Sequence, residues 1–197
     1  MKRRFSRIVS VVCAMAFLVT SIVFFPTQKN SADEQYELVW SDEFDGNALD
    51  DNNWTCEIGT GAGGWGNNEQ QYYRDSADNI EVSNGTLKIH ALKQSYGGKQ
   101  YTSARLKTQG KQSFKYGKIE AKMRLPRFQG AYPGFWTLGE NITSVGWPAC
   151  GEMDIMEAIN DNDNIYSNLH WVYNGSRVDT SGGAYNVGDR TQWHTYE

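Results

Sequence analysis

Cysteine is scarce in this chain, with 3 in 197 residues. Cys13 lies in an apolar N-terminal stretch and is interpreted as inert, which leaves Cys56 and Cys150. A disulfide between these two is allowed if the chain is exported to an oxidising compartment. Two small buried hydrophobic side chains are the simpler interpretation, and we favour it, because the sequence does not bring the two cysteines within bonding distance.

Basic residues are also few once the N-terminus is set aside. The chain has 19 Lys and Arg against 23 Asp and Glu, but residues 1–32 hold five of the basic residues and no acidic one. Residues 33–197 therefore carry 14 basic and 23 acidic residues, a net charge of −9. A duplex nucleic-acid binder needs a basic face, so the acidic balance argues against this class of protein. It also argues against a strongly anionic polymer as the ligand.

Helical periodicity is nearly absent, and we find no internal repeat and no low-complexity linker. Two segments, 86–92 and 118–125, alternate apolar and polar side chains, as a strand with one buried face does. Asn84-Gly85 predicts a tight turn. The other predicted strands are residues 37–40, 54–58, 80–82, 101–108, 135–138, 152–157, 164–171 and 192–197. Many short antiparallel strands with Gly and Asn turns predict an all-β protein, a sandwich or a barrel.

Residues 1–32 have the features of a secretory signal. Four basic residues stand within the first seven positions, residues 8–25 are almost wholly apolar, and Ser31-Ala32 offers small residues for cleavage. We therefore expect the protein to be extracellular. The apolar stretch is long for a signal, so an uncleaved membrane anchor is the alternative.

Acidic residues cluster in one apolar predicted strand, at Glu152, Asp154 and Glu157. In a regular strand the first two share a face and Glu157 falls on the opposite one. The apolar residues Met153, Ile155 and Met156 likewise cannot all point inward. One extra residue, a β-bulge around Ile155-Met156, resolves both conflicts, because it buries the apolar residues and returns Glu157 to the face of the other acids.

Three carboxyl groups on one face repel one another, so at least one should hold its proton near neutral pH. A retaining glycosidase needs this, because one carboxylate is the nucleophile and a second carboxyl group acts as acid and then as base. The alternatives are a solvated strand face and, the better of the two, a hard cation bound by the three carboxylates. Nearby aromatic and polar residues favour a sugar-binding cleft: Trp65, Trp136, Trp147, Asn67, Asn68 and Arg105.

From about Leu38 to its end, the sequence resembles glycoside hydrolase family 16, in its laminarinase (endo-β-1,3-glucanase) branch. The matching segments are VWSDEF (39–44), GWGNNE (64–69), QYY (71–73), YTSARL (101–106), GFW (134–136) and GWPAC (146–150), which leads into the acidic strand. Each segment is weak alone, but six in order are specific. The bulged spacing before Glu157 is that of laminarinases, agarases and carrageenases, whereas lichenases of the family lack the extra residue.

The resemblance implies a jelly-roll β-sandwich of two curved antiparallel sheets, with the cleft across the concave face. It implies hydrolysis with retention, with Glu152 as the nucleophile, Glu157 as the acid/base and Asp154 as the supporting acid. The sugar contacts it implies are Asn68, Arg105, Trp136, Trp147 and His170. Plain structural roles stay open for two of these, a surface ion pair for Arg105 and a structural histidine for His170.

No cofactor is implied for catalysis, but family members often bind a structural calcium on the convex side. Glu43 and Gly85 would supply ligands there through backbone oxygens, with an ordinary turn as the alternative. Tyr132 stands where the family commonly has Trp, and its ring can still stack on a sugar. A complete domain of the family runs further, so we expect residues 33–197 to be its N-terminal portion, incomplete and truncated at the C-terminus.

The expected function is secreted endo-hydrolysis of β-1,3-glucan. The polysaccharide is the expected partner, without nucleic acid or a protein partner, and the protein is expected to be a monomer. One alternative is a non-catalytic β-glucan-binding protein on the same fold; such proteins typically lose the acids that this chain has. The other is a transglycosylase, which the sequence does not separate from a hydrolase.

Overall fold

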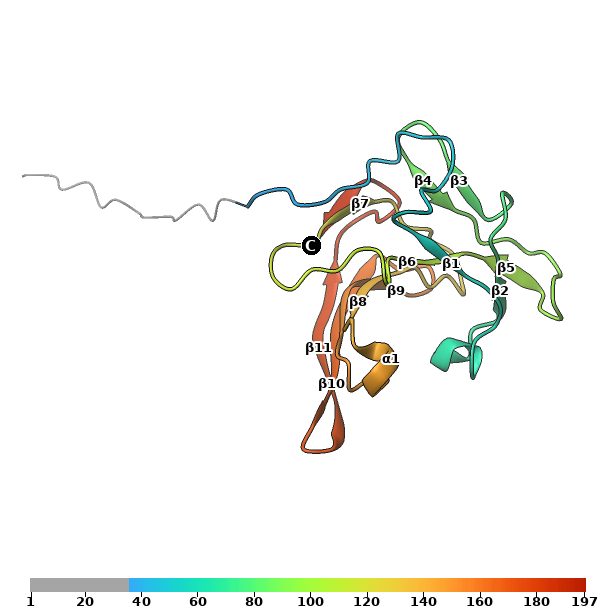
Figure 1. Cartoon of the computed structure of the whole chain (residues 1–197). Coiled ribbons are helices and arrows are strands. Elements are labelled where there is room, and N and C mark those ends of the chain that lie inside the picture. The colour runs from blue at the N-terminus through green and yellow to red at the C-terminus, as the bar shows by residue number, and fades with distance from the viewer. Residues whose placement is uncertain (1–35) are drawn as a thin grey trace, which may run out of the picture. The chain divides into compact units, whose positions relative to one another are not determined.

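The computed structural model describes residues 36–197. The predicted secretory signal at residues 1–32 lies outside the described residues. Within 36–197, no helix combines the length and the apolar character needed to cross a membrane. Nearly all regular structure in this range is β-strand (Figure 1), which confirms the predicted all-β class.

The described strands are short except for three near the C-terminal end. They are β1 (Thr55–Glu57), β2 (Gln71–Tyr73), β3 (Ile80–Val82), β4 (Leu87–Ile89), β5 (Tyr101–Ser103), β6 (Arg105–Lys107), β7 (Ala121–Met123), β8 (Gly134–Leu138), β9 (Glu152–Ala158), β10 (Asn164–Tyr173), β11 (Ser176–Asn186) and β12 (His194–Tyr196). Two short helical segments, η1 (Gly64–Asn68) and α1 (Ile142–Val145), lie in the connections.

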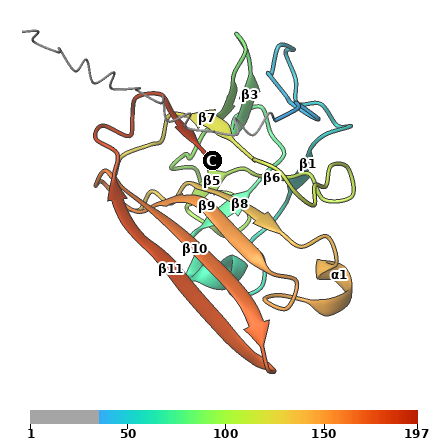
Figure 2. The ribbon, with the colours of Figure 1, turned by 90° about the vertical axis from the view of Figure 1, so that its left-hand side faces the viewer.

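The largest sheet has four antiparallel strands in the order β11-β10-β9-β8, which lie side by side in Figure 2. The remaining strands form two-stranded pairs, β1 with β6, β3 with β4, β7 with β12, and β2 with β5. The pairing of β2 with β5 is parallel and the others are antiparallel. β9 is an inner strand of the large sheet, so the acidic segment has a neighbouring strand on each side.

The hydrophobic core lies between the large sheet and the β7–β12 pair. Its buried members are Leu125, Ile155, Met156, Ala158, Ile165 and Tyr196, with Ile119, Met123, Phe135 and Val187 packed around them. Each large apolar side chain removed from water here stabilises the fold by about 1.5–3 kcal/mol. Because three of the buried residues belong to β9, core packing fixes the strand that carries the acids.

Two strand predictions differ from the structure, and two strands were not predicted. Residues 37–40 lie in no strand; the ring of Trp40 packs against Trp54 and Phe114, with centroid distances of 6.1 and 6.0 Å. The predicted strand 101–108 is two strands, since β5 pairs with β2 and β6 pairs with β1. Strands β2 and β11 were not predicted; β11 is largely exposed and rich in Gly, Ser and Thr, so it shows no apolar alternation.

Cys56 and Cys150 are free thiols, and both are half-buried. Burial, assisted by the negative charge of Asp75, raises the pKa of the Cys56 thiol to about 11. A thiol with so high a pKa is a poor nucleophile at neutral pH. The structure therefore agrees with the favoured interpretation of these cysteines as small packing residues.

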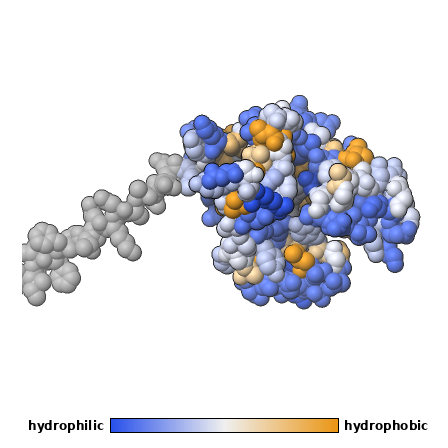
Figure 3. Space-filling view, turned by 90° about the horizontal axis from the view of Figure 1, so that it is seen from below, coloured by the Kyte–Doolittle hydropathy of each residue, from blue (hydrophilic) through white to orange (hydrophobic). Residues whose placement is uncertain are grey.

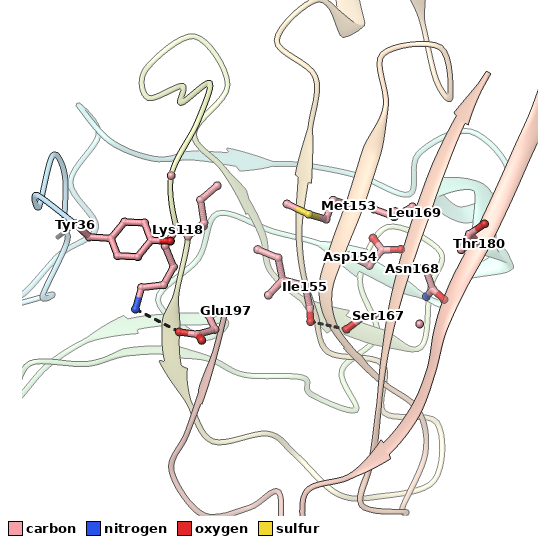
Figure 4. A pocket seen from close by; sticks show the side chains of 13 residues that line it. Tyr36, Lys118, Met153, Asp154, Ile155, Ser167, Asn168, Leu169, Thr180 and Glu197 are labelled. Carbon is pink, nitrogen blue, oxygen red and sulfur yellow. Dashed lines mark hydrogen bonds and ion pairs between the residues drawn. The ribbon is translucent and has the colours of Figure 1, made fainter. Parts of the chain in front are cut away.

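A hollow of about 600 Å³ lies beside β9 and β10, and Figure 4 shows the side chains that line it. Met153, Ile155 and Leu169 line it, and the Lys118–Glu197 ion pair (3.3 Å) stands at its other side. The prediction that Met153 is buried is wrong, because this side chain borders the hollow and is 43% exposed.

Candidate active site

The acidic strand β9 contains the predicted bulge. On its β8 side, Phe135 pairs with Met156 and Trp136 pairs with Asp154, so Ile155 has no partner in β8. On its β10 side the register shifts at the same place, between Tyr166 and Asn168. The Ser167 hydroxyl donates to the Ile155 carbonyl at 3.0 Å, which satisfies a backbone acceptor within the bulge.

The bulge lets two consecutive apolar residues turn inward. Ile155 and Met156 are both buried, Met156 to 1% exposure, while the next residue, Glu157, faces the other acids. A regular strand would direct Met156 to the face of Glu152 and Asp154 and Glu157 to the opposite face, because side chains alternate with a period of two. The predicted grouping of Glu152, Asp154 and Glu157 is therefore confirmed in geometry.

Asp154 is the buried member of the group, with 4% exposure. Burial, and then the negative charges of Glu157 and Glu152, raise the pKa of Asp154 from its ordinary 3.8 to about 6. His170 opposes this shift, since its Nε2 lies 3.2 Å from Asp154 Oδ2. At least one acid of the three was expected to hold its proton near neutral pH, and Asp154 is the one whose pKa is raised in that direction.

Glu157 receives a hydrogen bond at each carboxylate oxygen. The Tyr132 hydroxyl donates to Oε1, and the side-chain amide of Asn168 donates to Oε2 at 2.6 Å. Asn168 lies on β10 directly opposite Asp154, so its side chain spans the two acids. These two donors fix the direction of the Glu157 side chain.

Glu152 is held from the loop that precedes it. The indole N–H of Trp147 donates to Glu152 Oε2. The loop is tight: a Cβ on Gly139 would lie 2.0 Å from the Cys150 carbonyl oxygen, so only glycine fits where β8 leaves the sheet. Glycine at this position thus allows the close approach that brings Trp147 over the start of β9.

His170 lies at the same end of the group and contacts both the acids and the loop. Its ring centroid is 5.9 Å from that of Trp147 at an interplanar angle of 52°. The Arg177 guanidinium lies over the Trp147 ring, 4.4 Å from its centroid. Two predicted sugar contacts, Trp147 and His170, are therefore brought together beside Glu152 and Asp154.

Arg105 and Trp136 form a second cluster on the β8 side. The Arg105 guanidinium lies between two indole rings, 4.7 Å from the centroid of Trp136 and 4.7 Å from that of Trp65. Its Nε also donates to Glu57 at 2.5 Å, so the ion pair offered as a structural alternative is present together with the stacking. Trp136 lies beside the acidic strand, because it pairs with Asp154 across β8 and β9.

Asn68 stands apart from these clusters. It is exposed at the end of η1 in a left-handed backbone conformation (φ 56°), and its carbonyl accepts a 2.6 Å hydrogen bond from the Gln70 side chain. The contacts described for Asn68 are with its own loop.

Three residues with contacts in the site were not predicted as site residues: Tyr132, Asn168 and Asp179. Tyr132 stood out only as a replacement for a common Trp, and nothing marked its hydroxyl as a donor to an acid. Asn168 could have been found from its position two residues before His170, on the same face of a strand. Asp179 lies in the unpredicted β11, but Asn174-Gly175 is a two-residue hairpin signal, and a hairpin around it pairs Asp179 with His170.

The predicted calcium ligands, Glu43 and Gly85, lie near one another. The Glu43 carbonyl oxygen and Asp45 Oδ1 are each 3.8 Å from the position that a Cβ on Gly85 would take. An all-oxygen set of this kind, with backbone carbonyls and one carboxylate, fits a hard cation such as calcium. Within residues 36–197, no three His, Cys, Asp or Glu side chains form a group able to hold a metal ion.

Figure 3 shows the end of the molecule that lies lowest in Figure 1, where α1, η1 and the β10–β11 turn are found. This surface is mainly hydrophilic, with apolar side chains in small separate patches.

Comparisons with known proteins agree with this geometry. Residues 23–155 match the family described as "Beta-glucan synthesis-associated protein SKN1/KRE6/Sbg1". The chain is 48% identical over 142 residues to the Clotting factor G alpha subunit of Tachypleus tridentatus, covering 72% of this chain and 20% of that protein. It is 39% identical over 191 residues to a Beta-glucanase of Rhodothermus marinus, covering 92% of this chain and 66% of that protein. A Beta-1,3-glucan-binding protein of Penaeus monodon is 30% identical over 179 residues, covering 68% of this chain and 48% of that protein.

Solved structures give the same result. The laminarinase of Rhodothermus marinus superposes with a TM-score of 0.73 at 42% identity, covering 82% of this chain and 66% of that one. The chain thus spans less than two thirds of the length of the first relatives that it matches. The likeness confirms the predicted jelly-roll β-sandwich. On the match over residues 23–155 and the likeness to solved laminarinases, this chain belongs to glycoside hydrolase family 16, in its laminarinase-like branch.

Proposed function

We propose that the protein is a retaining endo-glycosidase that hydrolyses β-1,3-glucan. The observation that carries the proposal is the group of Glu152, Asp154 and Glu157 on one face of the bulged β9. Close carboxyl groups in different environments, one buried and two half-buried, suit a reaction that needs a nucleophile and a proton donor. Relatives named as glucanases and laminarinases support the β-glucan substrate.

In the proposed reaction, a Glu152 carboxylate oxygen attacks the anomeric carbon while the glycosidic C–O bond breaks. Glu157 gives its proton to the departing oxygen, which leaves a covalent glycosyl ester on Glu152. Glu157 then takes a proton from water, the water oxygen attacks the anomeric carbon, and the ester bond breaks. Two inversions at one carbon give net retention.

Asp154 is proposed as the supporting acid. It stands between the other two carboxyl groups in sequence, and its raised pKa of about 6 favours its protonated form compared with an ordinary aspartate. A protonated neighbour can donate a hydrogen bond to the nucleophile and limits the repulsion among the acids.

Trp136, Trp147, Arg105, Asn68 and His170 are proposed to form the sugar-binding surface. Indole rings offer flat apolar faces to sugar rings, and two of these residues lie beside the acids. The stacking of Arg105 on Trp136 supports a role in keeping that indole in place. Asn68 is proposed to contact a sugar further from the bond that is cleaved.

The test is the release of reducing sugar from laminarin and lichenan by the full-length protein. Glu157→Gln should lower kcat by roughly 10²–10⁴-fold, and Glu152→Gln by at least as much. The matched control is Glu120→Gln, which alters an exposed glutamate ion-paired to Lys118 at 2.5 Å. Full activity in both site variants would overturn the proposal. Retention of configuration is tested by NMR, which identifies the anomer of the released sugar that forms first.

A non-catalytic β-glucan-binding protein is the second candidate, and the Penaeus monodon relative is the observation that favours it. Binding of laminarin without release of reducing sugar by the wild type would decide for it. Transfer of the glycosyl group to a sugar acceptor uses the same first step, and chromatography of the products separates longer oligosaccharides from hydrolysis products.

Two further proposals concern the whole protein. Residues 1–32 are proposed as a secretory signal, with an uncleaved anchor as the alternative; the N-terminal sequence of secreted protein distinguishes them. A structural calcium ion is proposed at the Glu43 and Gly85 carbonyls, with Asp45 as a further ligand. When bound, such an ion would link two chain segments. Thermal unfolding with calcium and with a chelator tests it in the wild type and in Asp45→Asn.

A further inference from the structure

His170 lies between two carboxylates that come from different strands. Its Nδ1 is 2.5 Å from Asp179 Oδ1 on β11, and its Nε2 is 3.2 Å from Asp154 Oδ2 on β9. The backbone register produces this arrangement, because His170 on β10 pairs with Asp179 on one side and Glu152 on the other. Each ring nitrogen of His170 therefore faces a carboxylate oxygen.

This arrangement makes the position of one proton depend on Asp179. A neutral imidazole has a single N–H, and the hydrogen bond made by one nitrogen decides which nitrogen carries it. A carboxylate at Nδ1 keeps the N–H there and makes Nε2 the more basic nitrogen. The proton shared between His170 Nε2 and Asp154 is then drawn toward the histidine, which favours the Asp154 anion.

We propose that Asp179 is a positioning residue of the acidic group: through His170 it sets the ring orientation and the protonation of Asp154. The proposal rests on the proposed function for its effect on the reaction, because Asp154 is there the supporting acid of Glu152. Burial and the neighbouring acids favour the protonated form that donates to Glu152, and Asp179, through His170, limits how far this form is favoured. His170 lies between Asp179 and Asp154. The proposal therefore gives Asp179 no direct contact with the sugar.

The surroundings of His170 agree with this role. The charged groups that face it are Asp154 and Glu152 from β9 and Asp179 from β11, while Arg177 Nε lies 2.8 Å from Asp179 Oδ1. The hydrogen bonds from His170 and Arg177 lower the pKa of Asp179, so it is ionised when the others titrate. The hydrogen bond to Asp179 and the nearby acidic charges outweigh burial and raise the pKa of His170.

Exposure falls along the row from Asp179 (47%) through His170 (20%) to Asp154 (4%). The row thus connects a solvated carboxylate to a buried one through a single imidazole. A proton on Asp154 can exchange with solvent through the His170 imidazole. A buried carboxyl group without such a contact lacks this route.

The first experiment follows the imidazole of His170 by NMR during a pH titration of the full-length protein. His170→Gln identifies the resonance by its loss. Asp179→Asn keeps an acceptor oxygen near Nδ1 but removes the charge, and it should lower the titration midpoint of His170 by about one pH unit. The control Asp78→Asn removes an exposed carboxylate that is 3.5 Å from Arg74, and it should leave the midpoint unchanged. An unchanged midpoint in Asp179→Asn overturns the proposal.

The second experiment measures kcat/KM against pH on laminarin. Asp179→Asn should shift the pH profile relative to wild type, Asp179→Glu should restore the wild-type profile in part, and Asp78→Asn should not change it. A uniform loss of activity with an unshifted profile would make Asp179 merely structural and overturn its proposed role. If the wild type cleaves no glucan, the proposed function fails, while the NMR titration still decides whether Asp179 controls His170.

Discussion

The hydroxyl of Tyr132 donates a hydrogen bond to Oε1 of Glu157, and the residue that forms this bond stands where the family commonly has tryptophan. The Asn168 amide donates to Oε2, so both carboxylate oxygens of Glu157 accept a hydrogen bond and the orientation of the side chain is fixed. Tyr132 is therefore more than a stacking surface, because it determines the orientation of the proposed acid/base.

Removing this hydroxyl should slow the reaction more than it weakens binding. In Tyr132→Phe the ring remains but Glu157 loses one of two donors, so we expect kcat on laminarin to fall roughly 10- to 150-fold, the equivalent of one lost hydrogen bond to a charged group of about 1.5–3 kcal/mol. Tyr132→Trp, which restores an N–H donor, should recover part of the loss. An unaltered kcat in Tyr132→Phe, measured by initial rates, would show that the hydroxyl plays no part.

The buried carboxyl of Asp154 predicts a specific dependence of stability on pH. Its pKa is about 6 in the folded protein against an ordinary 3.8, raised by burial and by the charges of Glu157 and Glu152. Between these values the folded state binds more protons at this site than the unfolded chain does. The contribution of Asp154 to the free energy of unfolding is therefore present below 3.8 and is lost as the pH rises to about 6.

Asp154→Asn should accordingly raise the melting temperature relative to wild type at neutral pH. At a pH below 3.8, the ordinary pKa of an aspartate, it should not raise the melting temperature. Thermal unfolding followed by circular dichroism at both pH values checks this. The same difference in melting temperature at both would count against the raised pKa. Activity should fall in the variant, since the supporting acid is lost.

The bulge depends on Met156 as its buried anchor. Met156→Ala should lower the free energy of unfolding by about 2–5 kcal/mol, because it leaves a cavity in the core. Met153→Ala, at the neighbouring exposed position, is the matched control and should cost clearly less. Chemical denaturation measures both, and equal losses in the two variants would contradict the assigned directions of these side chains.

Arg105 stacks between Trp65 and Trp136, and lysine cannot reproduce this geometry. Arg105→Lys should raise KM for laminarin roughly 2- to 30-fold, the range that corresponds to a cation–π contact of about 0.5–2 kcal/mol. Arg74→Lys is the matched control, because Arg74 stacks on Tyr96 at 4.1 Å, away from the acids. A KM that rises equally in both variants, measured by steady-state kinetics, would exclude a specific role of the Trp136 contact.

The sequence by itself determined the bulge and the grouping of the acids. Both follow from one strand: Glu152 and Glu157 stand at an odd spacing, and two adjacent apolar residues both need burial. These conflicts are local, and only one extra residue resolves them. The sequence motifs likewise determined the family, since six short segments in fixed order are improbable by chance.

Only the tertiary structure decided which groups surround those acids. Tyr132 reaches Glu157 from the segment before β8, 25 residues away along the chain, and Asp179 reaches His170 across the β10–β11 hairpin. Strand β11 has too little apolar alternation to be predicted by itself, and its pairing with β10 decides which of its side chains lie beside the acids. Local side-chain patterns fix which face a residue takes, whereas non-local pairing fixes its neighbours.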